Sequence, residues 1–419
     1  MMDAHDDAAV IRARTESTSG AAGSSSQTAL EPYDNAALQI FVTDPEKHGS
    51  GMDAYVSFCV TTKTTMQEFQ AQEFFVRRRY TDFVWLRSKL FSEFSTSVIP
   101  QLPSKDVAKH LNRFSPEFLE KRRYFLERFL RRCASHAKLS TSKDLHTFLE
   151  AKKWALDTAK KEKGEFLSSV KDSIDKRVAS YKLKNPDERF ANLRSHANSL
   201  GEHLTSLEKI GTKVQKHASD IADDLQEMGP VFTMLANSES ELRDVFTQAG
   251  QAFDKLATIG HETAEKLDAL YNNPVHEYVL YAAASADLLD KRDVVEYQCE
   301  NAQNTLMKHE NERNSLESSD GKAGLGSFFS SKNPELLKQE KLDKLATAIA
   351  EDEQTLREKQ QEKKETDELV LQEFDSWHSR KVKDFKKILT DLANAQIAHH
   401  SQNLKIYESL LPHFEKIDA

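Results

Sequence analysis

The strongest constraint on this chain is a stretch of about 80 residues near its C-terminus, 334–414, which is rich in charged residues and contains no glycine. As one helix it would extend about 120 Å, because an α-helix rises about 1.5 Å per residue. Its apolar residues recur mostly at intervals of three or four. A helix of this length needs a partner along its side, so the sequence favours an elongated antiparallel bundle over a compact domain.

Helix-forming sequence extends upstream of this stretch to about residue 187. Proline or glycine interrupts it at three places: Gly229-Pro230, Asn272-Asn273-Pro274, and the glycine- and serine-rich segment 321–334. We interpret the first as a kink and the other two as breaks. The sequence therefore predicts a domain at 187–419 with three long helices, at about 187–271, 275–318 and 334–415.

The N-terminal part of the chain has a different residue composition and predicts different secondary structure. Residues 1–35 are rich in Ser, Thr, Gly and Ala, and this low apolar content predicts a disordered tail. Between 36 and 152, the runs LQIFV, AYVSFCVTT and EFFVRRRY are rich in β-branched and aromatic residues and predict strands. After these runs, apolar residues recur at intervals of three or four, which predicts helices. We therefore expect an α+β domain with a three-stranded antiparallel sheet and several helices, and a linker at 153–186.

Charge is distributed unevenly between these two domains. The whole chain has a formal net charge of -9, but segment 36–151 holds more basic than acidic residues, whereas the rest is acidic. This balance argues against nucleic acid as a partner and assigns an anionic partner to the first domain. Since no apolar run approaches the roughly 20 residues that span a bilayer, we expect a cytosolic protein that meets membranes only peripherally.

Catalysis and bound cofactors have no support in the sequence. Cys59, Cys133 and Cys299 are far apart and form no CxxC pair, which argues against a disulfide framework or a zinc site. Motifs of the GxxxxGK[ST], GxSxG and strand-linked GxGxxG types do not occur in the chain. We therefore expect a non-enzymatic protein without a cofactor or a metal.

One constellation in the first domain suits a phosphorylated ligand. RRRY at 77–80 ends the third predicted strand, the loop IPQLPSK follows the next predicted helix, and KRR at 121–123 lies on the helix after it. An inositol phosphate needs arginine forks and a lysine for its phosphates, and an aromatic ring for its C–H face. A solvated basic face explains three consecutive arginines equally well.

The strand exit RRYTDFVWL, followed by the loop IPQLPSK, resembles the signature of the phox-homology (PX) domain, over about 36–152. This resemblance implies that the domain binds phosphatidylinositol 3-phosphate. By matching position, it implies that Arg79 binds the 3-phosphate and that Tyr80 stacks beneath the inositol ring. It further implies that Lys105 binds the 1-phosphate and that Arg122 holds the 4- and 5-hydroxyls.

Two further segments have patterns typical of membrane contact. Within 164–181, helical spacing aligns an apolar stripe with basic residues beside it, as in an interfacial helix; packing against the neighbouring bundle is the alternative. The stripe contains Phe166, Leu167, Val170, Ile174 and Val178. A basic group on the last helix either faces anionic lipid or is simply solvated. It consists of Arg380, Lys381, Lys383, Lys386 and Lys387.

The helical domain resembles the BAR domain of sorting nexins, in which three long helices dimerise into an elongated curved rod. NPVHEYVLYAAASADLLDKRD at 273–293 resembles in particular the subgroup of sorting nexins 7 and 30. The resemblance implies a protein that senses or generates curved membrane on the cytosolic face of early or recycling endosomes, during endosomal recycling and autophagy-related protein transport. It implies a homodimer, or a heterodimer with a sorting nexin 4-like protein. The rival interpretation is a coiled-coil scaffold whose PX domain docks proteins rather than lipid.

Overall fold

The computed structural model describes residues 37–103, 114–152, 183–184, 186–318 and 334–415. Within 37–152, which we call the sheet domain, three strands form one antiparallel sheet in the order β1-β2-β3. They are β1 Leu38–His48, β2 Tyr55–Thr64 and β3 Glu73–Arg79, with a short turn, η1 Gly51–Asp53, between the first two. Alternate side chains of β1 point into the core. The predicted three-stranded antiparallel sheet is confirmed.

Helices complete the core of the sheet domain. They are α1 Tyr80–Glu93, α2 Pro116–Ser135, the 3-10 turn η3 Leu139–Thr141, and α3 Lys143–Glu150. The start of α2 follows from its sequence, because Ser115 Oγ accepts a hydrogen bond from the Phe118 backbone N–H at 3.3 Å. Pro116 occupies the first helical position, where no intrahelical donor is needed.

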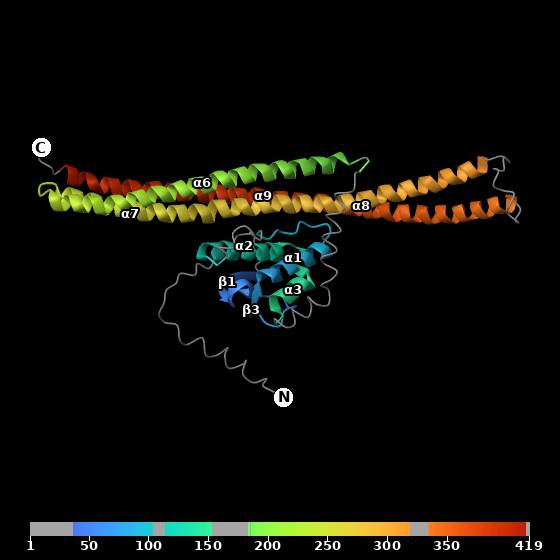
Figure 1. The fold of residues 1–419 in the computed structure, drawn as a ribbon, viewed down its shortest axis with the longest axis horizontal. Coiled ribbons are helices and arrows are strands. Elements are labelled where there is room, and N and C mark those ends of the chain that lie inside the picture. Colours follow the sequence, from blue (N-terminus) through green and yellow to red (C-terminus); the bar gives the residue numbers. More distant parts are fainter. Residues whose placement is uncertain (1–36, 104–113, 153–182, 185, 319–333, 416–419) are drawn as a thin grey trace, which may run out of the picture.

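The second domain is a rod of long helices (Figure 1). Helix α6 Glu188–Ser238 is followed, after a turn of the chain, by α7 Arg243–Leu267. A π-helical turn, η4 Asp268–Asn272, joins α7 to α8 Asn273–Ser318. Helix α9 Pro334–Phe414 runs back along the rod. At one end α6, α7 and the last part of α9 form a bundle, and at the other α8 and the first part of α9 form a two-helix arm. Within the described ranges, no helix combines the length and the apolar content needed to cross a membrane.

The first break in the rod differs from the predicted one. The sequence predicted a helix over about 187–271, a break at 272–274 and a new helix from 275, but α6 ends at Ser238 and the chain turns at 239–242, which contains neither glycine nor proline. The predicted boundary at 271–275 is wrong. The wide π-helical turn lets the chain pass Pro274 without ending the helix, because it relieves the clash of the proline ring with the preceding turn.

Glycine at position 229 reflects close helix packing rather than a helix end. Helix α6 continues through Pro230, and a Cβ at Gly229 would collide with the carboxylate of Asp254 on α7. A similar approach occurs at Gly260 of α7, where a Cβ would press against Ala222 of α6. The small residues therefore let α6 and α7 approach each other closely along the bundle.

The sheet domain packs against the middle of the rod (Figure 1). Its α2 and the segment before α2 reach α8 and α9. Val98 of the sheet domain is buried in the same apolar cluster as Tyr278 of α8 and Trp377 of α9. The two domains thus share part of one core, so side chains of the sheet domain have fixed positions relative to the rod.

Candidate functional site

The junction of β3 and α1 holds two of the predicted ligand-binding residues. The backbone N–H of Arg79 donates to the Asp82 carboxylate at 2.8 Å, which caps α1 and fixes the position of Arg79 at the helix start. The Arg79 side chain is 46% exposed, and its Nε lies 3.5 Å from Asp82 Oδ1. Its guanidinium carbon lies 6.0 Å from the Tyr55 ring centroid. Arg79 therefore presents a solvent-accessible cation beside an aromatic ring.

Tyr80 occupies the centre of this group. The Arg122 guanidinium carbon lies 4.5 Å from the Tyr80 ring centroid and 4.4 Å from that of Phe118. The Tyr80 hydroxyl donates to the carbonyl oxygen of Pro103 at 2.6 Å. Burial raises the pKa of Tyr80, while the nearby charges of Arg122 and Arg87 oppose that rise. The phenol therefore remains a hydrogen-bond donor at neutral pH.

The structure brings together Tyr80 and Arg122, with Arg79 adjoining them in the chain. These three residues are candidates for binding an inositol headgroup, and we call them the headgroup site. Lys105, the fourth predicted ligand, lies outside the described residues. The sequence reasoning missed Phe118, which contacts Arg122. The spacing of the two on α2 could have indicated it, because residues four apart are neighbours on one helix face.

The basic group predicted on α9 was Arg380, Lys381, Lys383, Lys386 and Lys387. The prediction that they share one exposed face is wrong. Lys381 is buried, and its Nζ lies 4.7 Å from the Trp377 ring centroid. Burial lowers the pKa of Lys381. The physical reason is that α9 is packed on more than one side here, so successive residues of a basic run cannot all reach solvent.

Two other members of this group have acidic partners. Arg380 Nη2 lies 3.9 Å from Glu373 Oε1, and Lys387 is paired with Asp391 one turn further along α9. The exposed members are Lys383 and Lys386. A lipid-facing role for charge on α9 therefore depends mainly on these two lysines.

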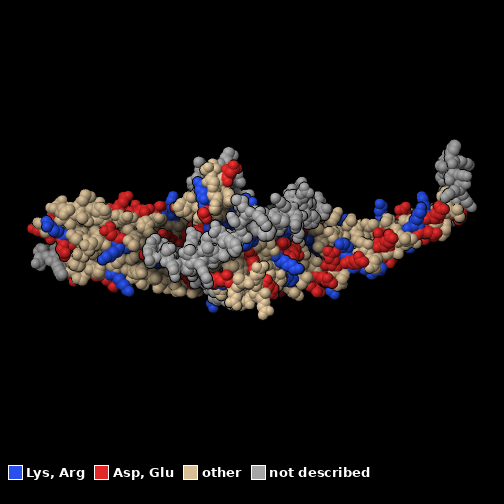
Figure 2. Space-filling model, turned by 90° about the horizontal axis from the view of Figure 1, so that it is seen from below, with Lys and Arg blue, Asp and Glu red and all other residues tan. Residues whose placement is uncertain are grey.

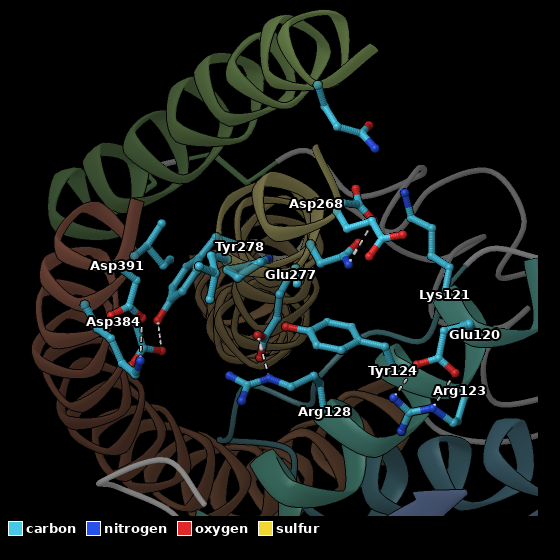
Figure 3. Close-up of a pocket in the computed structure, with 18 of the residues that line it drawn as sticks. Glu120, Lys121, Arg123, Tyr124, Arg128, Asp268, Glu277, Tyr278, Asp384 and Asp391 are labelled. Carbon is cyan, nitrogen blue, oxygen red and sulfur yellow. Dashed lines mark hydrogen bonds and ion pairs between the residues drawn. The ribbon is translucent and has the colours of Figure 1, made fainter. Parts of the chain in front are cut away.

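A cavity of about 750 Å³ lies between α2 and the rod (Figure 3). Its walls carry several carboxylates from the rod, including Asp268, Glu277, Asp384 and Asp391. On the α2 side, Arg128 points toward Glu277. The acidic character of the rod side makes this cavity unsuited to an anionic headgroup.

Buried ion pairs form one wall of the cavity and join the two domains. The Nε atoms of Arg128 and Arg132 donate to the two Glu277 oxygens, at 3.0 and 2.6 Å. Arg132 also donates to Asp384 at 2.5 Å, and the Tyr278 hydroxyl donates to the same carboxylate. Burial would raise the pKa of Glu277, but the two guanidiniums outweigh it and lower the pKa to about 2. Glu277 is therefore charged at neutral pH and holds α2 against α8.

Two further candidate sites are a metal site and the predicted interfacial helix. Among the residues that the structure describes, no three His, Cys, Asp or Glu side chains gather as metal ligands would. The stripe predicted at 164–181 lies outside the described residues.

Comparison with known families assigns both domains. Residues 66–152 match the PX domain family, and residues 161–413 match the family described as Vps5 C terminal like. The second match covers more than half of the chain.

Whole-chain relatives agree with this assignment. Sorting nexin-30 of Xenopus tropicalis is 30% identical over 386 residues, which cover 91% of this chain and 78% of that protein. Sorting nexin-7 of Homo sapiens is 27% identical over 376 residues, covering 89% of this chain and 88% of that protein. In the cryo-EM structure of the SNX-BAR Mvp1 tetramer, a chain with 16% identity superposes with a TM-score of 0.67, covering 89% of this chain and 99% of the other. That likeness shows the fold.

Proposed function

This chain belongs to the sorting nexin family, with a PX and a BAR domain, and from that premise we propose that it binds phosphatidylinositol 3-phosphate and dimerises through its rod. A PX domain implies phosphoinositide or membrane binding, and a BAR domain implies dimerisation and membrane remodelling. Proteins of this family are generally non-enzymatic adaptors. The observation that carries the proposal is the headgroup site at the start of α1.

In this proposal each ligand group meets a suitable side chain. The exposed guanidinium of Arg79 binds the 3-phosphate, because a planar fork can donate two hydrogen bonds to phosphate oxygens. The Tyr80 ring supports the inositol, and Arg122, fixed between two aromatic rings, donates to its hydroxyls. Lys105 binds the 1-phosphate, as its place in the sequence motif suggests.

Exposed apolar residues on the rod support dimerisation. Every seventh residue of one α6 face is apolar and exposed, a spacing typical of a helix that meets another helix. These residues are Leu207, Val214, Ile221, Met228 and Leu235. A similar stripe on α9 contains Val382, Leu389, Ile397, Leu404 and Leu411. We propose that a second BAR domain covers both stripes, in a homodimer or in a heterodimer with a sorting nexin 4-like protein.

The cellular role that we propose is transport from endosomes. The dimer would sense or generate curved membrane on the cytosolic face of early or recycling endosomes, during endosomal recycling and autophagy-related protein transport. Lys383 and Lys386 on α9 would add attraction to anionic lipid. The segment at 164–181 would add an interfacial helix through Phe166, Leu167, Val170, Ile174 and Val178.

Sedimentation with liposomes tests the lipid specificity. Vesicles with and without phosphatidylinositol 3-phosphate are compared for the natural chain and for Arg79→Glu, and we expect charge reversal to weaken binding to the lipid-containing vesicles at least about thirtyfold. The control is Lys143→Glu, an exposed charge reversal at the start of α3 that lies outside the RRRY, IPQLPSK and KRR segments. This variant should retain most of the binding.

Two outcomes would contradict the proposal. Equal binding by Arg79→Glu and the natural chain would remove Arg79 from the site. The second outcome combines two observations: the natural chain does not bind the lipid, and a variant with Arg79 and Lys105 both replaced by Ala binds protein partners as well as the natural chain does. The scaffold interpretation would then replace the proposal.

A further inference from the structure

The segment 98–103 connects the headgroup site to the rod, and we call it the proline segment because it contains Pro100 and Pro103. At one end, its Pro103 carbonyl accepts the hydrogen bond from Tyr80 of the headgroup site. At the other end, the Val98 backbone N–H donates to Glu373 of α9 at 3.3 Å. The segment is therefore held by both domains, with a predicted ligand-binding residue at one end and the rod at the other.

A carboxylate of the rod also holds the middle of the proline segment. Oδ2 of Asp287 on α8 accepts hydrogen bonds from Gln101 Nε2 at 2.7 Å and from Arg87 Nη2 at 3.0 Å. Nε of the same Arg87 donates to the Pro100 carbonyl at 3.2 Å. A single oxygen of α8 thus orients the segment directly through Gln101 and indirectly through Arg87.

Arg87 makes this arrangement sensitive to the rod. Its side chain is only 13% exposed, so its guanidinium has lost most of its hydration and depends on nearby acceptors. Burial lowers the pKa of Arg87, and the charge of Asp287 and its hydrogen bond oppose that shift. Without Asp287, the guanidinium would have to move toward another acceptor or toward water, and the proline segment that it orients would move with it.

We propose that Asp287, although it belongs to the BAR domain, is a positioning residue of the headgroup site. It fixes Gln101 and Arg87, these fix the proline segment, and the segment fixes the Tyr80 hydroxyl. The affinity for the phosphorylated inositol headgroup of a lipid is therefore set partly by how the rod sits against the sheet domain. The inference rests on the proposed function, because it assigns a regulator to that same site.

The chain offers a matched control on the same helix. Asp290 lies three residues after Asp287 on α8, and its Oδ1 accepts from Arg194 of α6 at 2.6 Å. The ion pair of Asp290 with Arg194 stays within the rod, whereas the ion pair of Asp287 with Arg87 reaches the sheet domain. Asp287→Ala and Asp290→Ala therefore remove the same charge from the same helix but break different contacts.

The test measures binding of a soluble, short-chain phosphatidylinositol 3-phosphate to the full chain by isothermal titration calorimetry, which avoids effects of vesicle avidity. We expect Asp287→Ala to raise the Kd at least about threefold, because residues that link two sites change affinity about two- to thirtyfold. Asp290→Ala should leave the Kd unchanged. Melting temperature and dimer mass by light scattering establish that each variant is folded. If Asp287→Ala does not fold, Gln101→Ala, which removes the direct contact, takes its place with the same expectation.

A double variant separates positioning from general damage. Tyr80→Phe keeps the ring but removes the hydrogen bond to Pro103, so Asp287→Ala should have little further effect on the Kd in a Tyr80→Phe background. Fully additive losses would overturn the proposed route through Tyr80. If the natural chain binds the lipid and Asp287→Ala binds it equally well, Asp287 has no positioning role. If the natural chain itself does not bind, the proposed function fails instead.

Discussion

Arg78 and Arg79 are neighbours in β3, but their side chains have different environments. Successive side chains point to opposite faces of a strand, and Arg78 points inward and is 1% exposed. Its guanidinium donates to the carbonyl oxygens of Phe148 and Ala151, at 2.7 and 2.5 Å. Arg78 therefore ties β3 to the end of α3, while Arg79 remains accessible to a ligand.

Replacing these two arginines should separate stability from binding. Arg78→Ala leaves the buried Phe148 carbonyl and the part-buried Ala151 carbonyl without their charged donor, and we expect it to lower the free energy of unfolding by about 2–3 kcal/mol. Arg79→Ala should change stability by less than about 0.5 kcal/mol, as surface substitutions usually do, while it weakens lipid binding. Urea unfolding and vesicle sedimentation measure the two effects. A stable Arg78→Ala protein that has lost lipid binding would reverse this assignment.

The sequence could single out Arg79, Tyr80 and Arg122 as candidates because they belong to a local motif and to a helix with a clear period. It could not assign the structural roles of the arginines beside them. Arg77 binds Asp44, which is 33 residues away, and Arg78 binds Phe148, which is 70 residues away. Such partners depend on the folded arrangement of the whole domain, which a reading of adjacent residues does not contain.

At the scale of elements, the sequence predicted the last long helix, but it did not predict the turn between α6 and α7. The expected helix at 334–415 agrees with α9 to within a residue, because helix-forming residues without glycine fill the stretch and its start follows a glycine-rich segment. The turn at 239–242 has no glycine or proline to mark it, and at Pro274 a π-helical turn replaced the expected break. The turn at 239–242 brings α6 and α7 together along their lengths, and this packing involves residues far apart in the chain.

The contact between α2 and α8 should depend on pH in a direction that Glu277 determines. Its pKa is about 2 in the folded chain and lies well below the ordinary value of 4.5 that applies when the chain is unfolded. The stabilisation from the charged Glu277 is therefore complete above about pH 4.5 and is lost as the pH falls toward 2. Across pH 5–8 this contact should stay constant.

Urea unfolding of the natural chain and of Glu277→Gln, measured at several pH values, checks this prediction. Removing the anion leaves Arg128 and Arg132 without it in a buried site, so we expect a loss of about 3–5 kcal/mol at pH 7 that shrinks as the pH approaches 2. Glu202→Gln, an exposed position on α6, serves as the control and should differ little from the natural chain. A constant difference between Glu277→Gln and the natural chain at all pH values would contradict the ion-pair explanation.

At the scale of the whole molecule, the placement of the sheet domain on the rod has the largest consequence for membrane attachment. Viewed from the side of the sheet domain, the two-helix arm carries Lys and Arg intermixed with Asp and Glu (Figure 2). A surface of mixed sign gains little from an anionic membrane, because attraction and repulsion largely cancel. Attachment should therefore depend on the headgroup sites, and the proposed dimer links two of them.

Replacing one residue of the exposed α6 stripe tests this dependence on the dimer. Ile221 is 59% exposed in the single chain, and covering this exposed part contributes about 1–2 kcal/mol to association. Ile221→Glu should therefore give the mass of a monomer in light scattering. Thr212→Glu, nine residues earlier and so on the opposite side of α6, adds the same charge and should leave the dimer intact.

The two variants should also differ in how they bind membranes. Linking two sites in one particle raises the apparent affinity for a surface that presents many headgroups, whereas it leaves the affinity for one soluble headgroup unchanged. We therefore expect Ile221→Glu to bind soluble phosphatidylinositol 3-phosphate like the natural chain but to bind vesicles at least about tenfold more weakly. A monomeric Ile221→Glu that binds vesicles as tightly as the dimer would show that one sheet domain suffices, and the rod would then act on membrane shape rather than on attachment.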